Sequence, residues 1–485
     1  MTATLPERRR WLALYVLCLG VLMIVLDTTI VNVALPSIRA DLGFTAASLS
    51  WVMNAYMLTF GGFLLLGGRL GDLFGHRRVF LLGTTFFTLT SLGCGLATTQ
   101  QWLVAARAVQ GLGGAVMTAV ALSLIVSLFS TPRDRARALA IYGFVCAGGG
   151  SIGVLLGGLL TSALSWHWVF LVNLPVGVLV FVLCRRLVPP GHSPAAPPRL
   201  DVGGAFTITA ALMLAVYAVV NTNTAGWTSA RTLEQLAGAA LLFALFLTLE
   251  LRSPAPLVPL RLFRLRNLAV ANLIGVLWAA GMFAWFFMSA LYMQLLLGYD
   301  ALRVGLAFLP ANLIMAAFSL GLSARAVLRF GLKRPIVVGL TLAAAGLALF
   351  ARAPHAGTFL IDVLPAMVLL GIGAGLGFNP VLLAAMGDVG DEESGLASGV
   401  VNTSFMLGGA LGLATLASLA ATRSATAQLA GGATHAAALA AGFQLAFLIG
   451  AAFTALAALL GGALLRPASA TAGAAAGSAA DSASA

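Results

Sequence analysis

The sequence predicts an all-α integral membrane protein, built from two six-helix bundles with two additional transmembrane helices between them. Hydrophobic residues make up 60% of the 485-residue chain and charged residues only 9%, which is too apolar for a water-soluble surface. The mean hydropathy is +1.01. Apolar runs of about 20 residues, each long enough to cross roughly 30 Å of hydrocarbon as a helix, recur along most of the chain.

About fourteen of these runs are expected to span the membrane. In chain order, the expected spans are 11–34, 49–68, 79–96, 102–124, 138–162, 168–184, 202–220, 233–251, 268–293, 302–323, 335–350, 359–386, 396–419 and 443–465. Because the number is even, both termini are expected on the same side of the membrane.

Two proline-containing links, 188–200 and 253–266, divide the spans into groups of six, two and six. The expected parts are an N-terminal segment 1–10, a first six-helix bundle 11–187, a linker region with two helices 188–266, a second six-helix bundle 267–466 and a tail 467–485. The tail is rich in Ala, Ser and Gly, cannot bury a core and is expected to be disordered.

A weak internal repeat supports two related halves. The stretch GGRLGDLFGHRR (67–78) is echoed by SARAVLRFGLKR (323–334), with Gly75 opposite Gly331, although Asp72 has no acidic counterpart. Short basic turns can also match by chance. Transporters with two such halves bind substrate near the middle of the membrane, between the halves.

The placement of the basic residues predicts the orientation. With the N-terminus inside, about 21 of the 27 Lys and Arg residues fall in cytoplasmic segments, as the positive-inside rule requires. The external segments hold Arg39, Arg231, Arg303, Arg352 and Arg423. Both termini are therefore expected in the cytoplasm. Each basic cluster is short and caps an apolar helix, so the net charge of +12 does not predict a nucleic-acid partner.

Cysteines and phosphate-binding loops give no sign of a cofactor. Cys18, Cys94, Cys146 and Cys184 are widely spaced within expected spans, which predicts neither disulfides nor a metal site. The sequence lacks the G-x-x-x-x-G-K-[ST] loop that binds ATP, so ATP is not expected to be the direct energy source within this chain. The start ERRRWLALYVLCLG resembles a signal peptide, but its apolar run is too long, and we expect a retained first helix.

The stretch LDTTIVNVALP (26–36) places Asp27 deep inside the first span. A charge at the centre of a bilayer costs about 2.5–3.5 kcal/mol or more. Arg107 lies inside the fourth span, and a rise of about 1.5 Å per residue brings both residues to a similar depth. Burial favours a neutral carboxyl and a nearby cation favours a charged one, which suits a group that exchanges a proton. Three arrangements stay open: proton or cation coupling, a permanently paired strut, and residues that never meet.

Several motifs together resemble the major facilitator superfamily, and within it the fourteen-helix drug:proton antiporters of the EmrB/QacA type. LDTTIVNVALP resembles the first-helix motif of these antiporters, and GGRLGDLFGHRR resembles the signature turn between helices two and three. RAVQGLGGA (107–115) is similar to the fourth-helix motif. WHWVFLVNLPVG and SGVVNTSFMLGGALGLA resemble stretches of helices six and thirteen. The likeness runs to Leu465 and implies the fold of this superfamily and proton-coupled export of drugs.

The resemblance implies that the turn between helices two and three latches the outward-open conformation. The residues that match the family's turn are Gly68, Asp72, Gly75, Arg77 and Arg78. A carboxylate at the end of helix two would dock on a helix N-terminus, and the arginines would meet anionic headgroups or acidic residues. The alternative is a basic anchor that only sets the topology.

The fifth span departs from the family's pattern. G-x-x-x-G-P-x-x-G-G is expected there, whereas this chain has GGSIGVLLGG from Gly149, with Val154 in the place of proline. The glycines Gly149, Gly153, Gly157 and Gly158 still permit close helix contact, so they are the expected gating residues. Whether the missing proline bend alters gating stays open.

Polar and aromatic residues expected to face a central cavity are the candidates for substrate contacts. These are Asn54, Tyr56, Gln110, Trp285, Tyr292 and Asn402. An apolar cleft with a few polar groups suits drug-like ligands. Each residue has an alternative role in an ordinary interhelical hydrogen bond or packing contact.

These observations predict a secondary active transporter of the bacterial inner membrane, and not an enzyme. It is expected to work as a monomer and to use inward proton movement to export amphiphilic small molecules, including drugs. Its expected partners are that substrate, protons and membrane lipids. A dedicated exporter of one endogenous metabolite is an open alternative. A non-transporting membrane sensor is a further alternative. The sequence shows no soluble domain long enough to signal, which argues against it.

Overall fold

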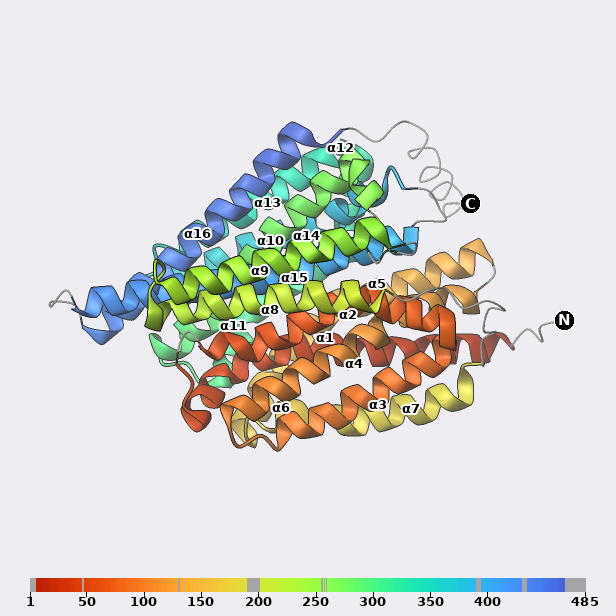
Figure 1. The fold of residues 1–485 in the computed structure, drawn as a ribbon, viewed down its shortest axis with the longest axis horizontal. Helices are drawn as coiled ribbons and strands as arrows, with labels where there is room; N and C mark the ends of the chain where they lie inside the picture. Colours follow the sequence, from red (N-terminus) through yellow and green to blue (C-terminus); the bar gives the residue numbers. More distant parts are fainter. Residues whose placement is uncertain are drawn as a thin grey trace.

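The structure, a computed structural model, describes residues 6–45, 48–129, 131–189, 201–253, 256, 258, 260–389, 394–429 and 434–466. All regular secondary structure in these ranges is helical. Figure 1 shows the helices side by side along one long axis, as a transmembrane bundle requires, because only a helix or a closed barrel satisfies its own backbone groups in lipid.

The helices fall into three groups in chain order. The first group is α1 (Glu7–Leu42), α2 (Trp51–Phe74), α3 (His76–Gly95), α4 (Gln100–Leu128), α5 (Pro132–Ala163), α6 (Trp168–Leu171) and α7 (Asn173–Leu187). The linker helices are α8 (Val202–Ala225) and α9 (Ala230–Arg252). The last group is α10 (Arg266–Leu295), α11 (Ala301–Ala317), α12 (Ser323–Phe330), α13 (Lys333–Phe350), α14 (Leu364–Met386), α15 (Ser394–Leu429) and α16 (His435–Leu464).

Length and hydropathy confirm a multi-pass membrane protein. Within the described ranges, 10 helical segments are long and apolar enough to cross a membrane. Large apolar side chains also point outward along the bundle: Leu82, Leu241 and Ile361 are 66%, 72% and 77% exposed. A soluble protein rarely exposes so much contiguous apolar surface, and lipid tails are its natural surroundings.

Several of the predicted spans differ in their bounds from the helices; for example, α15 runs on to Leu429 and α16 begins at His435. The first span does not end at residue 34, because α1 continues through Pro36 to Leu42; a proline is tolerated inside a transmembrane helix where neighbouring groups compensate for the lost N–H. The sixth span is divided into α6 and α7. The break precedes Pro175, which has no N–H to donate and whose ring crowds the carbonyl of Leu171.

The two basic repeat segments are mostly helical, which corrects their prediction as turns. α2 continues to Phe74 and α12 to Phe330, so the first turn narrows to Gly75 alone and the second to Gly331 and Leu332. Gly75 and Gly331 have φ of 88° and 74°, a conformation that favours glycine. Each glycine donates its N–H to the carbonyl four residues earlier, at 2.9 and 2.8 Å. The two segments therefore share a backbone geometry as well as a sequence pattern.

The linker helices lie over the seam between the other two groups. α2 packs on α4 and also on α15, and α8 contacts both α2 and α15 while α9 packs on α8 (Figure 1). The hydroxyls of Thr222 on α8 and Ser418 on α15 are buried and hydrogen-bonded at 2.8 Å. On the α2 side, Phe206 meets Phe63 edge-on, with ring centroids 5.3 Å apart.

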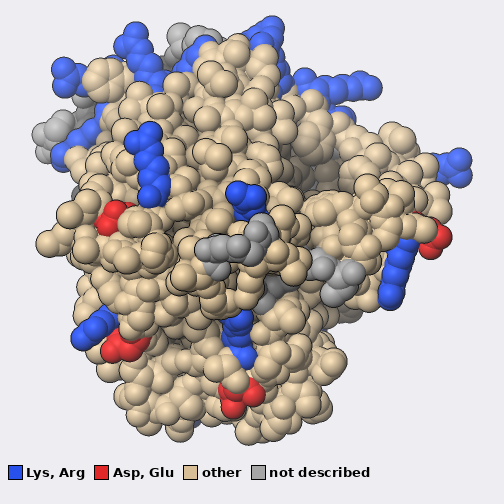
Figure 2. Space-filling model, turned by 90° about the vertical axis from the view of Figure 1, so that its left-hand side faces the viewer, with Lys and Arg blue, Asp and Glu red and all other residues tan. Residues whose placement is uncertain are grey.

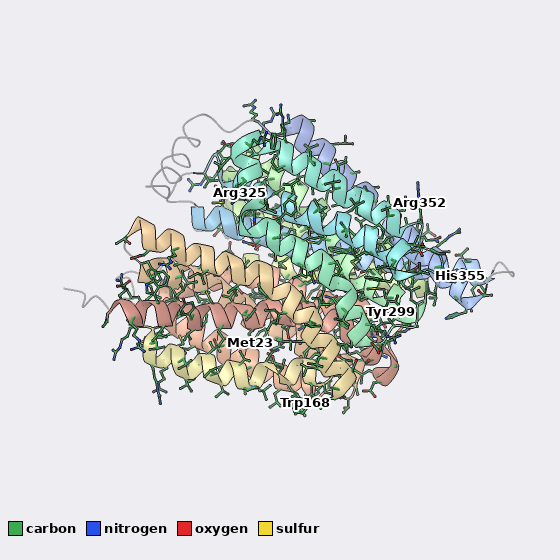
Figure 3. All side chains as sticks on the ribbon, turned by 180° about the vertical axis from the view of Figure 1, so that it is seen from behind. Met23, Trp168, Tyr299, Arg325, Arg352 and His355 are labelled. Carbon is green, nitrogen blue, oxygen red and sulfur yellow. The ribbon has the colours of Figure 1, made fainter. Side chains whose placement is uncertain are left out.

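The two ends of the bundle differ. The start of α1 lies at the end that carries Arg325, and Trp168, Tyr299, Arg352 and His355 lie toward the opposite end (Figure 3). Figure 2 looks at that opposite end, whose face is mostly uncharged with a few acidic and basic side chains, while further Lys and Arg side chains project beyond its upper edge.

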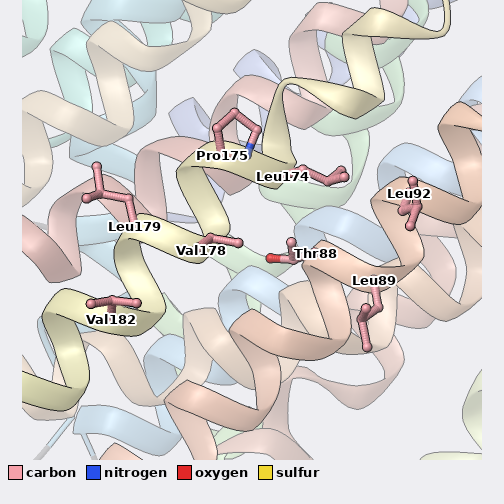
Figure 4. Close-up of a pocket in the computed structure, with 8 residues that line it drawn as sticks. All are labelled: Thr88, Leu89, Leu92, Leu174, Pro175, Val178, Leu179 and Val182. Carbon is pink, nitrogen blue, oxygen red and sulfur yellow. The ribbon is translucent and has the colours of Figure 1, made fainter.

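An apolar groove runs along the outside of the first group, between α3 and α7 (Figure 4). It is lined by Thr88, Leu89, Leu92, Leu174, Pro175, Val178, Leu179 and Val182. All but Thr88 are apolar, so the groove matches lipid tails. α7 thus turns one face to lipid, while Asn173, Gly177, Val180 and Cys184 form its buried face at helical spacing.

Candidate functional site

Asp27 and Arg107 form an ion pair inside the first group of helices. Nη1 of Arg107 on α4 lies 2.5 Å from Oδ2 of Asp27 on α1, and both side chains are 0% exposed. The arrangement in which these residues never meet is therefore excluded. A buried pair of this kind is costly to desolvate, and removing one partner leaves an uncompensated charge.

The guanidinium of Arg107 is held by three helices. Its Nε donates to the carbonyl of Val52 on α2 at 3.0 Å, and Nη1 also donates to Oε1 of Gln110 at 2.7 Å. The guanidinium carbon lies 4.3 Å from the ring centroid of Tyr56, within cation–π range. Arg107 is therefore fixed in place whether or not Asp27 is charged.

The other carboxylate oxygen of Asp27 belongs to a closed ring of four hydrogen bonds. Gln110 Nε2 donates to Asp27 Oδ1 at 2.9 Å and to Ser91 Oγ at 2.8 Å. Asn173 Nδ2 donates to the same two oxygens, at 3.1 and 3.3 Å. We call Asp27, Ser91, Arg107, Gln110 and Asn173 the Asp27 cluster. All five side chains are at most 4% exposed, and together they satisfy a buried carboxylate.

Local sequence explains how four helices supply this cluster. Arg107 and Gln110 are three residues apart on α4 and therefore share one face. Ser91 lies on α3, where its hydroxyl also donates to the carbonyl of Phe87 at 2.8 Å. Asn173 is the first residue of α7, directly after the break before Pro175. The cluster therefore ties together α1, α3, α4 and α7.

Sequence reasoning missed two members of the cluster and gave a third another role. Asn173 lies in the quoted stretch WHWVFLVNLPVG, which was a usable signal. Ser91 gave none, because a serine in a helix usually bonds its own backbone. Gln110, predicted as a substrate contact, lies against Asp27, and the Sγ of Cys94 is 3.5 Å from its Oε1.

The remaining predicted substrate contacts come from three helices, α2, α10 and α15. Asn54 and Tyr56 are fully buried on α2, and in the described part of the chain the amide atoms of Asn54 and the hydroxyl of Tyr56 have no hydrogen-bond partner. On α10, Trp285 packs against Phe286 with ring centroids 4.4 Å apart. The Tyr292 hydroxyl, also from α10, donates to the carbonyl of Pro354 at 2.7 Å. Asn402 on α15 is exposed.

The predicted gating glycines of α5 face two different helices. A methyl group on Gly149 would lie 2.9 Å from Leu22, and one on Gly157 would lie 2.5 Å from the carbonyl oxygen of Ile30, both on α1. Gly153 also faces α1, at Thr29. These three glycines therefore close the first group on itself, and only the fourth, Gly158, contacts the last group.

Contacts between α5 and α11 are reciprocal. A methyl group on Gly158 would lie 2.6 Å from the carbonyl oxygen of Ala301, and one on Gly305 would lie 3.0 Å from that of Val154. A hydrogen bond of 2.9 Å from Gln294 on α10 to the carbonyl of Val33 on α1 also joins the two groups. Backbone approaches this close exist only where glycine leaves room.

The predicted latch is described only in part. Arg77 Nη2 donates to the carbonyl of Arg185, the third residue from the end of α7, at 2.5 Å, while Arg78 is exposed. A methyl group on Gly68 would meet nothing within 4 Å. The side chain of Asp72 lies outside the described residues. Arg77 therefore braces the α2–α3 turn against α7.

A bundle of membrane-crossing helices in two packed groups, with a buried carboxylate–guanidinium pair, defines a polytopic transporter. The chain belongs to the Major Facilitator Superfamily, whose profile matches residues 17–413. This confirms the family predicted from the motifs, and the protein is a transporter and not an enzyme.

Relatives of this chain include exporters and resistance proteins. The chain is 42% identical over 407 residues to the Cephamycin export protein CmcT of Amycolatopsis lactamdurans, covering 83% of this chain and 84% of that one. It is 39% identical to the Puromycin resistance protein pur8 of Streptomyces alboniger, covering 85% and 82%. It is 36% identical to the Multidrug resistance protein Stp of Mycobacterium tuberculosis, covering 87% and 78%.

Among solved structures, the fold is similar to that of the POT family transporter PepTSo. The TM-score is 0.67 at 18% identity, and the match covers 94% of this chain and 97% of the other. At this identity the likeness concerns the fold alone.

Proposed function

We propose that this protein exports antibiotic-like or other amphiphilic small molecules from a bacterial cell in exchange for protons, and that Asp27 carries the proton. The observation that carries the proposal is the fully buried pair of Asp27 and Arg107. A lone carboxylate in a bilayer interior is tolerable if it is paired while charged and neutral for the rest of a cycle. That alternation is what a proton antiporter needs, whereas a permanent strut would remain paired throughout.

Protonation of Asp27 would loosen the contact between α1 and α4. A neutral carboxyl loses its attraction for the guanidinium, while Arg107 keeps its hydrogen bonds to Val52 and Gln110. α1 also packs on α5 and touches α10 through Val33 and Gln294. A change at Asp27 would therefore reach the contacts between the two groups of helices, where alternating access takes place.

Positive-inside placement supports a topology of fourteen spans with both termini in the cytoplasm of a plasma-membrane protein. In this orientation, Gly158, Gly305 and Gln294 would lie near the external end, and their contacts would close the protein to the outside. The turn with Gly68, Asp72, Gly75, Arg77 and Arg78 would latch the opposite conformation. The protein would act as a monomer in contact with membrane lipids.

Substrate would bind between the two groups of helices. Asn54 and Tyr56 from the first group, with Trp285, Tyr292 and Asn402 from the last, are the proposed contacts. Asn54 and Tyr56 carry buried polar atoms with no partner in the described part of the chain, and a polar ligand group would satisfy them. Export of one endogenous metabolite is a second candidate, favoured by the relative named for cephamycin export.

A drug-susceptibility experiment tests the proposal. Cells that produce the wild type, Asp27→Asn or Asn272→Leu at equal membrane levels are challenged with a varied antibiotic panel that includes puromycin. Asn272 is the matched control because it is buried and donates to the carbonyl of Leu268 on its own helix. Wild type and control should protect against several compounds, and Asp27→Asn against none. Protection against a single compound would indicate the dedicated exporter, and full protection by Asp27→Asn would refute the role of Asp27.

A further inference from the structure

We propose that Asn173 is a positioning residue that sets the pH at which Asp27 takes up its proton. The inference rests on the proposed function, since it assumes that Asp27 exchanges a proton. It adds a residue that does not carry charge and lies on a different helix from Asp27 and Arg107. The geometry that points to Asn173 is the closed ring of hydrogen bonds in the Asp27 cluster.

Every group that contacts the carboxylate in this ring is a donor. Oδ2 of Asp27 accepts from Arg107, and Oδ1 accepts from Gln110 and Asn173. A protonated carboxyl has an O–H that needs an acceptor instead. In the described part of the chain, the carboxylate therefore meets three donors from two helices other than its own.

Ser91 keeps the two amides in their donor orientation. Its hydroxyl donates to the Phe87 carbonyl and its oxygen accepts from both Gln110 and Asn173, which uses one donor and two lone pairs. The Ser91 oxygen has no capacity left for another donor. Either amide could offer its oxygen to a protonated Asp27 only by turning over, and this would break its bond to Ser91.

Asn173 is the member of the cluster whose side chain can most easily turn away from Asp27. Gln110 shares α4 with Arg107 and bonds it directly at 2.7 Å, so it is fixed by the ion pair. The two hydrogen bonds of the Asn173 amide nitrogen are the longer two of the ring, at 3.1 and 3.3 Å. Asn173 also begins α7, next to the break before Pro175.

Few other charged or titratable groups face Asp27. α4 contributes Arg107, α2 contributes Tyr56 beneath the guanidinium, and α3 contributes Cys94 through its contact with Gln110. The glycines of α5 that face α1 bring no charge to it, and α10 contributes the uncharged Gln294. Among the described residues, α6 and α11 bring no ion pair or hydrogen bond to this carboxylate. Removing the neutral donor of Asn173 therefore leaves the charges around Asp27 unchanged, so its effect on proton uptake by Asp27 can be measured separately.

Replacing Asn173 by leucine removes one of three donors to the carboxylate. The charged form of Asp27 loses stabilisation and the neutral form does not, so the proton is taken up at higher pH. We expect the titration midpoint of Asp27 to rise by about one pH unit, the size of a single hydrogen bond to a charged group. Asn173→Gln keeps an amide donor, so its titration midpoint should rise less than that of Asn173→Leu.

Infrared difference spectroscopy of the purified, full-length protein tests this without a substrate. The carbonyl band of a protonated carboxyl is followed between about pH 4 and pH 9, and the Asp27 band is identified by its loss in Asp27→Asn. Asn173→Leu and Asn173→Ala should shift its midpoint upward, the matched control Asn272→Leu should not, and Asp27→Asn with Asn173→Leu should show no band.

The outcomes separate this inference from the proposed function. A wild-type Asp27 band that titrates, with the same midpoint in both Asn173 variants, would overturn the role of Asn173 alone. A wild-type Asp27 that does not change its protonation over the whole range would overturn both. If one variant does not fold, the other decides, because alanine and leucine differ in bulk but both remove the donor.

Discussion

Adding one methyl group at Gly158 should weaken the contact between α5 and α11, which we propose closes the external end. In Gly158→Ala the new methyl would lie 2.6 Å from the carbonyl oxygen of Ala301 and 3.0 Å from Cα of Leu302. Both neighbours are backbone atoms, so no side-chain rotation can relieve the overlap and α5 must move away from α11. Overpacking of this kind costs about 1–3 kcal/mol.

That cost falls only on the conformation in which α5 and α11 touch. A change of about 1–3 kcal/mol alters the ratio of two conformations roughly 5- to 150-fold, so the closed conformation should lose population. Spin labels on cysteines at Leu164, which is 57% exposed at the end of α5, and at the exposed Arg303 on α11 report the separation of these helices. Electron–electron double resonance should show fewer short distances in Gly158→Ala than in the parent protein.

A matched glycine on the same helix provides the control. A methyl group on Gly150 would meet only the Cγ2 of Thr29, at an ordinary 3.8 Å, so Gly150→Ala should keep the parent distance distribution. Gly305→Ala, which makes the reciprocal contact with Val154, should behave like Gly158→Ala. An unchanged distribution in both gate variants would refute the assignment of this contact as the external gate.

Three further predictions concern other parts of the molecule. Arg107→Lys should reduce efflux at least about tenfold at normal membrane levels, because one ammonium cannot reproduce the bonds of a fixed guanidinium; efflux at the parent rate would contradict this. Thr222→Val and Ser418→Ala should show a coupling of about 0.6 kcal/mol in a double-mutant cycle of unfolding in detergent, and strict additivity would mean that the linker helix is not anchored there. A cysteine introduced at position 196 should not react with a membrane-impermeant thiol reagent in intact cells, because this link is expected in the cytoplasm. Labelling would show that the predicted orientation is inverted.

Much of the fold could be predicted from the sequence, because a bilayer leaves few choices. A run of apolar residues long enough to cross the membrane has to be a helix, so α4, α10 and α14 appear close to their predicted places. The break between α6 and α7 was missed, although Pro175 marks it. The position of α8 against α2 and α15 depends on packing between distant segments, which periodicity does not encode.

Part of the candidate site could likewise be predicted from the sequence, and part could not. The pairing of Asp27 with Arg107 could be predicted because counting residues along each span gives the depth of both side chains in the same bilayer. Ser91 and Asn173 were missed because burying a neutral side chain in a bilayer costs much less free energy than burying a charge. Their presence in a span is therefore less unusual than that of Asp27. The direction in which Gly158 faces was also hidden, because neighbouring glycines on one helix point to different partners.

Whether binding of a drug releases the proton of Asp27 tests the central claim most directly. A compound exported by the cells is added to purified protein in weakly buffered detergent solution, and released protons are measured with a pH indicator. At a pH low enough that Asp27 is protonated before the compound is added, the wild type should release about one proton per molecule bound, as linkage between two exclusive ligands requires. Asp27→Asn should bind the compound and release none. Release of the same size from Asp27→Asn would contradict the account and leave Asp27 and Arg107 as a structural pair.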